Sequence, residues 1–189
     1  KAAFRDRLVA FGLGSKPALG LRGESAGSLP DEWSDLTRDT IAFGQGVAVS
    51  TVQMASAYAT IANGGVRLPA RLVEATVAED GEETPVGSGT PQRVVSEETA
   101  AAVTLMMEGV MGEGGTGRAA TVDGHRVAGK TGTAQRVDPA CGCYSGYNAS
   151  FMGFAPADDP RYVVAVSLLD PRRGNSGGAL AGPVFADVM

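Results

Sequence analysis

The chain has 189 residues, 43% of them hydrophobic and 20% charged, which is typical of one globular domain. Sixteen basic and 21 acidic residues give a net charge of −5, and this argues against a nucleic-acid-binding surface, which is basic. Two cysteines are too few for a disulfide scaffold. No apolar run approaches the roughly 18 residues of a membrane span.

Both ends of the chain interrupt a pattern. The first residues have helical spacing but no cap and no initiator methionine, and the last residues stop inside an apolar pattern. We therefore expect the chain to be a piece of a longer protein.

The N-terminal region predicts one helix followed by a long loop. Phe4, Leu8 and Phe11 recur at helical spacing, which predicts a helix over residues 1–11. Residues 15–40 are rich in Gly, Ser and Asp and have little periodicity. They predict a loop with one short turn near Trp33.

A stronger helix is predicted over residues 50–62. Ser50 and Gln53 form a Ser-x-x-Gln capping box, and Asn63-Gly-Gly65 supplies a left-handed stop. The apolar stripe consists of Met54, Ala57, Tyr58 and Ile61.

The middle of the chain predicts short strands, a loop and another helix. Residues 66–78 have room for one or two short strands, and residues 79–91 predict an acidic surface loop. Ser96 and two glutamates begin a helix over residues 96–111. The expected buried side of this helix consists of Val103, Met106, Met107, Val110 and Met111.

The last third has the two-residue period of β-strands. Strands are predicted at residues 126–137, 147–155 and 162–169, with a short loop at 156–160 that is typical of a hairpin. A final helix is predicted over residues 179–189. Helices followed by an antiparallel meander indicate an α+β fold, an antiparallel sheet with helices on its faces.

The segment around Lys130 fits two motifs with different chemistry, and the first is a P-loop. Residues 124–131 match Gly-x4-Gly-Lys-Thr, and residues 163–170 look like an apolar strand that ends in a magnesium-binding Asp. A P-loop needs a buried strand before it and a helix after it, and neither flank fits. A P-loop nucleotide hydrolase is therefore the less favoured alternative.

The second motif is the Lys-Thr-Gly element of serine enzymes that form acyl-enzymes with D-alanyl peptides or β-lactams. In that interpretation Lys130 binds the substrate carboxylate, the hydroxyls of Thr131 and Thr133 donate to it, and Gly132 lets a peptide lie along the strand edge. The backbone N–H of Thr133 is a candidate oxyanion donor. Strict alternation puts Lys130 and Thr131 on opposite faces, so the sequence does not prove that they converge. The plain alternative is an exposed lysine on an ordinary strand.

Six landmarks recur in order along almost the whole chain, at residues 43–46, 62–65, 108–117, 128–134, 150–156 and 178–185. With them, the sequence resembles the C-terminal part of the transpeptidase domain of class B penicillin-binding proteins. The resemblance is strongest to the division-specific septal peptidoglycan synthases of actinobacteria. It implies a D,D-transpeptidase that cross-links stem peptides through a serine acyl-enzyme and is acylated by β-lactams. It implies no metal and no organic cofactor, and it places Gln45 and Thr116 at the rim of the site.

The family's Ser-x-x-Lys and Ser-x-Asn motifs do not occur in this sequence. The resemblance therefore implies that the nucleophile and its base lie before Lys1, and that this chain supplies the third catalytic wall. The expected partners are peptidoglycan stem peptides, β-lactam antibiotics, the upstream part of the same domain and other cell-division proteins. The expected location is the extracytoplasmic face of the cell membrane, with an N-terminal anchor outside this chain. A non-catalytic β-lactam-sensing or scaffold domain of the same fold remains an alternative.

Three other reactive side chains receive structural interpretations. His125, the lone histidine, is expected to be partly exposed at the start of a strand. Cys141 and Cys143 lie in a loop between strands, and a disulfide and two free thiols are equally open.

Overall fold

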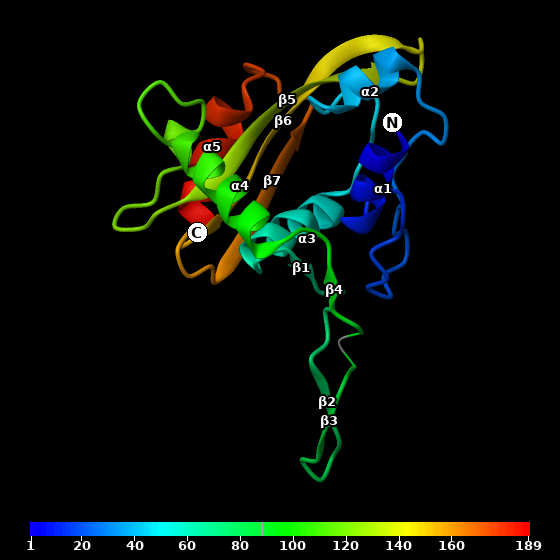
Figure 1. Ribbon diagram of the computed structural model, residues 1–189. Helices are drawn as coiled ribbons and strands as arrows, with labels where there is room; N and C mark the ends of the chain where they lie inside the picture. The colour runs from blue at the N-terminus through cyan, green and yellow to red at the C-terminus, as the bar shows by residue number, and fades with distance from the viewer. Residues whose placement is uncertain (88) are drawn as a thin grey trace.

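The computed structural model describes residues 1–87 and 89–189 (Figure 1). None of the helices that it describes is long and apolar enough to cross a bilayer. The elements in chain order are α1 (Ala2–Ala10), α2 (Asp35–Ile41), α3 (Thr51–Ala62), β1 (Val66–Arg67), β2 (Ala75–Val77), β3 (Glu83–Pro85), β4 (Gln92–Arg93), α4 (Glu97–Gly109), the 3-10 turn η1 (Arg118–Ala120), β5 (Ala128–Asp138), β6 (Cys143–Ala155), β7 (Tyr162–Leu169) and α5 (Gly177–Val188).

The three long strands form one antiparallel sheet in the order β5-β6-β7. On one face Phe151 of β6 packs against Phe185 of α5, with 4.7 Å between the ring centroids. On the other face Phe154 packs with Tyr58 of α3 and Met107 of α4. The expected α+β fold, with helices on the faces of an antiparallel sheet, is confirmed.

Helix α3 is held by its predicted cap and by one buried polar side chain. Ser50 and Gln53 form the capping box, and Gly64 and Gly65 end the helix with positive φ. The Gln53 side chain is 3% exposed, and its Nε2 donates to the carbonyls of Ser15 and Ala26, both at 2.9 Å. These bonds tie the N-terminal segment to α3, which packs on the sheet.

The expectation of a loop over residues 15–40 is wrong, because the segment contains the start of α2. Ser34 caps this helix, accepting from the N–H of Thr37 at 3.0 Å. A separate bridge pairs Ser28 with Ala48. A helix of seven residues shows no clear periodicity, so its local cap was the signal available in the sequence.

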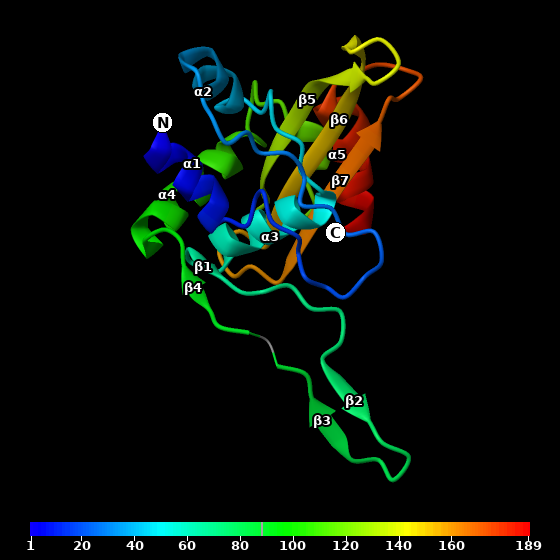
Figure 2. The same ribbon diagram turned by 90° about the vertical axis from the view of Figure 1, so that its right-hand side faces the viewer.

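The expected surface loop at residues 79–91 is also corrected, because β3 lies within it and pairs with β2. Ser88 in this range lies outside the described residues. The exposure was predicted correctly, since all three residues of β3 are exposed and the hairpin projects far from the body (Figures 1 and 2). The expectation of one or two short strands over residues 66–78 is confirmed by β1 and β2, and β1 pairs with β4.

The expected buried side of α4 is wrong at Met106, which is 72% exposed. Met107 packs with Phe154 on one face of the sheet, and Met111 packs with the core between the sheet and α5. The helix therefore contacts the rest of the domain along a narrow stripe. Met106 precedes Met107 by one residue, so its side chain projects about 100° away around the helix axis. In that direction it is mostly exposed.

Helix α5 begins two residues earlier than expected, at Gly177, because Ser176 is its cap. A Cβ at Gly177 would overlap the carbonyl oxygens of Gly132 and Ser150, and one at Gly178 would overlap that of Thr116. The two glycines therefore let the start of α5 lie flush against β5, β6 and the loop that carries Thr116.

Gly177→Ala is expected to destabilise the full-length protein by about 1–3 kcal/mol, since a methyl group has to displace backbone at this contact. Gly109→Ala is the matched control, because Gly109 ends α4 and has open space around it. The control should be neutral or stabilising by up to about 1 kcal/mol. Urea unfolding midpoints measure both, and equal midpoints would contradict the flush contact.

Candidate active site

Lys130, Thr131 and Thr133 lie on β5, the edge strand of the main sheet. The register from Ala128 to Gln135 is regular, so adjacent side chains alternate between faces. Thr131 is paired with Phe151 and so shares the α5 face. Lys130 starts on the opposite face, as strict alternation predicts.

The backbone groups of Thr131 and Thr133 face the open edge of β5. The N–H of Asp170 donates to the carbonyl of Tyr147 at 2.9 Å, so the backbone groups of Tyr147 point toward β7. Successive residues of a strand alternate between its two neighbours, so the even-numbered residues between 148 and 154 point toward β5. Each of these pairs with an even-numbered residue of β5. The odd-numbered Thr131 and Thr133 are left with N–H and C=O directed to the unpaired edge.

The Lys130 side chain bends around this edge to the other face. Its Nζ donates to the Thr131 carbonyl at 2.9 Å and to Thr131 Oγ1 at 3.2 Å. The ammonium pairs with no carboxylate among residues 1–87 and 89–189. An exposed ammonium without an ionic partner is suited to bind an external carboxylate.

Thr116 joins the same group from a different part of the chain. Its Oγ1 lies 2.9 Å from Thr131 Oγ1. The loop that carries it is fixed by the bond from the Gly117 N–H to the Val110 carbonyl at 2.9 Å. We name Lys130, Thr131 and Thr116 the edge cluster; the cluster places an ammonium and two hydroxyls at one point of the strand edge.

Thr133 is positioned by the start of α5. Its Oγ1 accepts from the N–H of Gly177 at 3.1 Å, and the hydroxyl hydrogen remains free to donate elsewhere. At Gly132, between the two threonines, a Cβ would overlap Ser150 Oγ. A side chain at Gly132 would therefore require the Ser150 hydroxyl to move.

Two other sequence candidates make no hydrogen bond to this cluster in the described chain. Gln45 is half-buried after α2, and its backbone N–H donates to the carbonyl of Thr40 within its own turn. No hydrogen bond joins Gln45 to Lys130 in the described chain. His125 is exposed in a turn before β5. No group of three metal-ligating side chains is found in the part of the chain that the structure describes.

The P-loop alternative does not fit the structure. Residues 128–131 of that motif lie inside β5 rather than in a loop, and the chain continues as strand to Asp138. No helix N-terminus follows Lys130, so the backbone cradle that binds phosphate is missing there.

One ion pair near the site was not foreseen. Arg126, two residues before β5, donates from Nε and Nη2 to both carboxylate oxygens of Glu108 on α4, each at 2.8 Å. The hydrogen bonds to the Glu108 carboxylate raise the pKa of the Arg126 guanidinium above its usual value. The pair fixes the end of α4 relative to the start of β5. The sequence signal available was limited to opposite charges 18 residues apart.

Two hollows in the surface lie near the N-terminus and not at the edge cluster. One is lined by residues that include Phe11 and Gln53, and the other by residues that include Leu13 and Asp31. Neither includes Lys130. The edge cluster therefore lies on an open strand edge, outside both hollows.

The sequence matches a family model over residues 1–189, and that model is described as the penicillin-binding protein transpeptidase domain. The chain belongs to this family. The resemblance found from the motifs is thus confirmed at the level of the transpeptidase domain.

Relatives of this transpeptidase chain are named as penicillin-binding proteins or as peptidoglycan transpeptidases. It is 44% identical to penicillin-binding protein PbpB of Mycolicibacterium smegmatis, over 98% of the chain and 30% of that protein. It is 38% identical to peptidoglycan D,D-transpeptidase FtsI of Escherichia coli K12, over 100% of the chain and 31% of that protein. A crystal structure of penicillin-binding protein 3 from Mycobacterium tuberculosis, complexed with aztreonam, matches with a TM-score of 0.92 and 42% identity, over 100% of the chain and 45% of that structure. The chain therefore spans about a third of the length of these curated relatives.

Proposed function

We propose that this chain supplies the Lys-Thr-Gly wall of a peptidoglycan D,D-transpeptidase. The observation that carries the proposal is the edge cluster: the Lys130 ammonium and the hydroxyls of Thr131 and Thr116 meet at an unpaired strand edge. The backbone N–H groups of Thr131 and Thr133 face that same edge. A peptide with a C-terminal carboxylate can add to such an edge as a strand and place its carboxylate on the ammonium.

In the proposed reaction a serine upstream of Lys1 attacks the carbonyl carbon of the penultimate D-Ala of a stem peptide. The proton of the serine passes to an upstream base, and the N–H of Thr133 donates to the oxyanion that forms. The C–N bond to the terminal D-Ala then breaks, and the leaving amine takes up a proton. An amine of a neighbouring stem attacks the resulting ester, forms the cross-link and releases the serine. A β-lactam acylates the same serine.

The side-chain roles follow from charge and position. Lys130 neutralises the substrate carboxylate, while the hydroxyls of Thr131 and Thr133 donate to it. Thr116 holds Thr131 in place through their hydroxyl contact. Gln45 is assigned to the outer rim, as the resemblance implies, and the roles at Gln45 and Thr116 depend on the upstream part of the domain.

The assignment extends to location and partners. We infer that the whole protein acts at the extracytoplasmic face of the cell membrane, where peptidoglycan is cross-linked, and that its anchor lies outside this chain. Its partners are stem peptides, β-lactams and other cell-division proteins. The names of the relatives, which include FtsI and PbpB, support this inference.

The experiment that tests the proposal uses the full-length protein and two measurements. A synthetic stem pentapeptide ending in D-Ala-D-Ala, mixed with an amine acceptor, should release D-Ala and yield a cross-linked product. A fluorescent penicillin should label the protein covalently and block both reactions. Labelling without release of D-Ala would favour a β-lactam-sensing or scaffold domain, and the absence of labelling would overturn the family function for this protein.

The 189 residues expressed alone are expected to fold poorly, or to fold only beside the upstream part of the domain. The edge of β5 is unpaired, and Leu105 and Met106 of α4 are 64% and 72% exposed. Unpaired edges and exposed apolar side chains favour association with other chains. Thermal unfolding followed by circular dichroism checks this, and a single cooperative transition of the isolated fragment would contradict it.

A further inference from the structure

The far end of the β5–β6 hairpin is a two-stranded ribbon outside the main sheet. Strand β7 pairs with β6 from Asn148 to Ala155, and the register of β5 and β6 shifts between Gln135 and Val137. Beyond that shift, the ribbon consists of the pairs Val137–Tyr144 and Asp138–Cys143. A two-stranded ribbon is marginally stable by itself, so what closes its turn decides how ordered it is.

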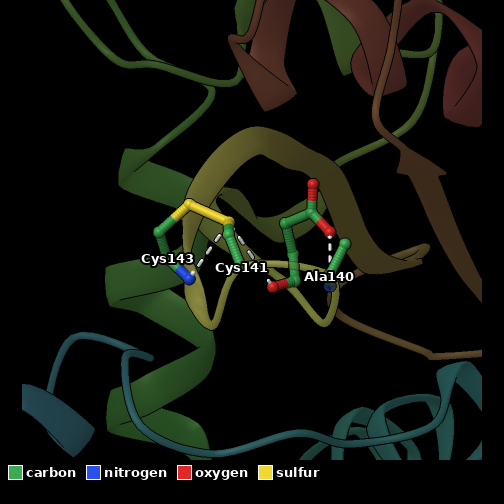
Figure 3. The surroundings of a disulfide bond; sticks show 4 residues. Ala140, Cys141 and Cys143 are labelled. Carbon is green, nitrogen blue, oxygen red and sulfur yellow. Dashed lines mark hydrogen bonds between the residues drawn. A yellow bond between two sulfur atoms is a disulfide. The ribbon is translucent and has the colours of Figure 1, made fainter.

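A disulfide between Cys141 and Cys143 closes this turn (Figure 3). The structure thus adopts one of the two states that the sequence left open. Both cysteines and Gly142 between them are exposed. These are the two cysteines of the sequence, and their Cα atoms are 5.2 Å apart. An external thiol therefore has direct access to the S–S bond.

The two sulfur atoms have different surroundings. The backbone N–H of Cys143 points to Sγ of Cys141 at 3.3 Å, and the carbonyl oxygen of Asp138 lies farther from the same atom, at 3.8 Å, whereas no described group donates to Sγ of Cys143. A thiolate is stabilised by a donated hydrogen bond, and the better stabilised thiolate leaves faster in disulfide exchange. The asymmetry thus makes Cys141 the preferred leaving group and Cys143 the preferred point of attack.

We propose that Cys141–Cys143 is a thiol–disulfide exchange site, in which an external dithiol attacks Sγ of Cys143 and expels the thiolate of Cys141. The first step forms an S–S bond between the dithiol and Cys143, and the electron pair of the broken bond goes to Sγ of Cys141. The second thiol of the reagent then attacks its own sulfur in the mixed disulfide and releases Cys143. The reagent ends as a disulfide, and the protein gains two electrons and two protons as two thiols.

Opening the disulfide has a local structural consequence. The turn keeps the bonds from the N–H groups of Ala140 and Gly142 to Asp138, but it loses its covalent closure. The ribbon should then open more often, while Lys130–Thr133 remain paired with β6 inside the three-stranded sheet. Reduction therefore changes the order of the hairpin end without dismantling the edge cluster.

The direction of attack is tested on the oxidised full-length protein with the monothiol glutathione. After brief exposure and an acid quench, peptide fragmentation locates the mixed disulfide. We expect an excess on Cys143 of about fivefold, the factor contributed by one ordinary hydrogen bond to the leaving thiolate. An equal distribution, or an excess on Cys141, would overturn the assignment.

Two matched variants give a second, independent readout. Cys143→Ser leaves Cys141 as a lone thiol beside the same backbone N–H, and Cys141→Ser leaves Cys143 without that donor. At neutral pH iodoacetamide should alkylate Cys141 in the first variant faster than Cys143 in the second. Equal rates would overturn the proposed asymmetry.

The structural consequence is measured by hydrogen exchange on the wild-type full-length protein before and after reduction with dithiothreitol. Amides of residues 137–144 should exchange faster by about tenfold, and those of residues 129–133 should change by less than about twofold. Unchanged exchange in residues 137–144 would overturn the proposal, as would free thiols at both positions in protein isolated from an oxidising compartment.

Discussion

Lys130→Ala in the full-length protein is expected to slow acylation by a carboxylate-bearing β-lactam by about ten- to a hundredfold. The Lys130 ammonium has no ionic partner in the described chain and lies at the strand edge where the ligand carboxylate is proposed to bind. A charge-assisted hydrogen bond contributes about 1.5–3 kcal/mol, which corresponds to this range of rates. Stopped-flow acylation measures the second-order rate constant.

Lys16→Ala is the matched control for this variant, because Lys16 is an exposed lysine in the N-terminal segment, away from β5. It should acylate within twofold of wild type, and both variants should keep the wild-type melting temperature. An acylation rate of Lys130→Ala within twofold of wild type would remove Lys130 from the site.

Thr133→Pro should reduce the limiting acylation rate by at least about 10²–10³, the contribution of one oxyanion-hole donor. Proline removes the backbone N–H, which faces the open edge and makes no bond to β6, so the sheet loses no ladder hydrogen bond. Gln135→Pro is the matched control. Gln135 has the same odd-numbered place on the edge strand but lies two residues beyond the proposed oxyanion donor.

Two further variants separate the side chain of Thr133 from its backbone. Thr133→Val keeps the N–H but removes the acceptor for Gly177, so it should lower both ligand affinity and stability, the latter by about 1–3 kcal/mol. Thr133→Ser keeps the hydroxyl and should restore both. All four variants are compared at saturating ligand after circular dichroism shows that each is folded. If Thr133→Pro acylates as fast as Thr133→Val, the Thr133 N–H is not an oxyanion donor.

The elements that the sequence predicted well are those set by local signals. The capping box at Ser50 and Gln53 and the alternating pattern of β7 involve residues near one another in the chain, and β7 has the predicted bounds. Helix α2 was missed because seven mostly exposed residues give no apolar stripe. Met106 was placed in the core because an apolar residue one position off the buried stripe reads the same in the sequence.

In the candidate site, too, local features were predictable from the sequence and long-range contacts were not. The residue types at Lys130 to Thr133 predict a carboxylate-binding site, but the sequence placed the side chains of Lys130 and Thr131 on opposite faces. It could not show how Lys130 Nζ returns to Thr131. The contacts of Thr116 with Thr131 and of Gly177 with Thr133 join positions 15 and 44 residues apart. Contacts at such separations depend on tertiary packing, and one sequence without its fold carries no signal for them.

The projecting β2–β3 hairpin also gives experimenters a place to attach a reporter. Around its turn, Gly81 donates to Ala78 and Ala78 donates to Glu82, so the backbone there bonds within the turn itself. Val77 beside the turn is 64% exposed, whereas Gly81 has a positive φ and should be kept as glycine. Exposed turns with purely local bonds are the positions that accept inserted sequence. A peptide tag or a fluorophore placed there would report on the protein while leaving the strand edge at Lys130 free for its ligand.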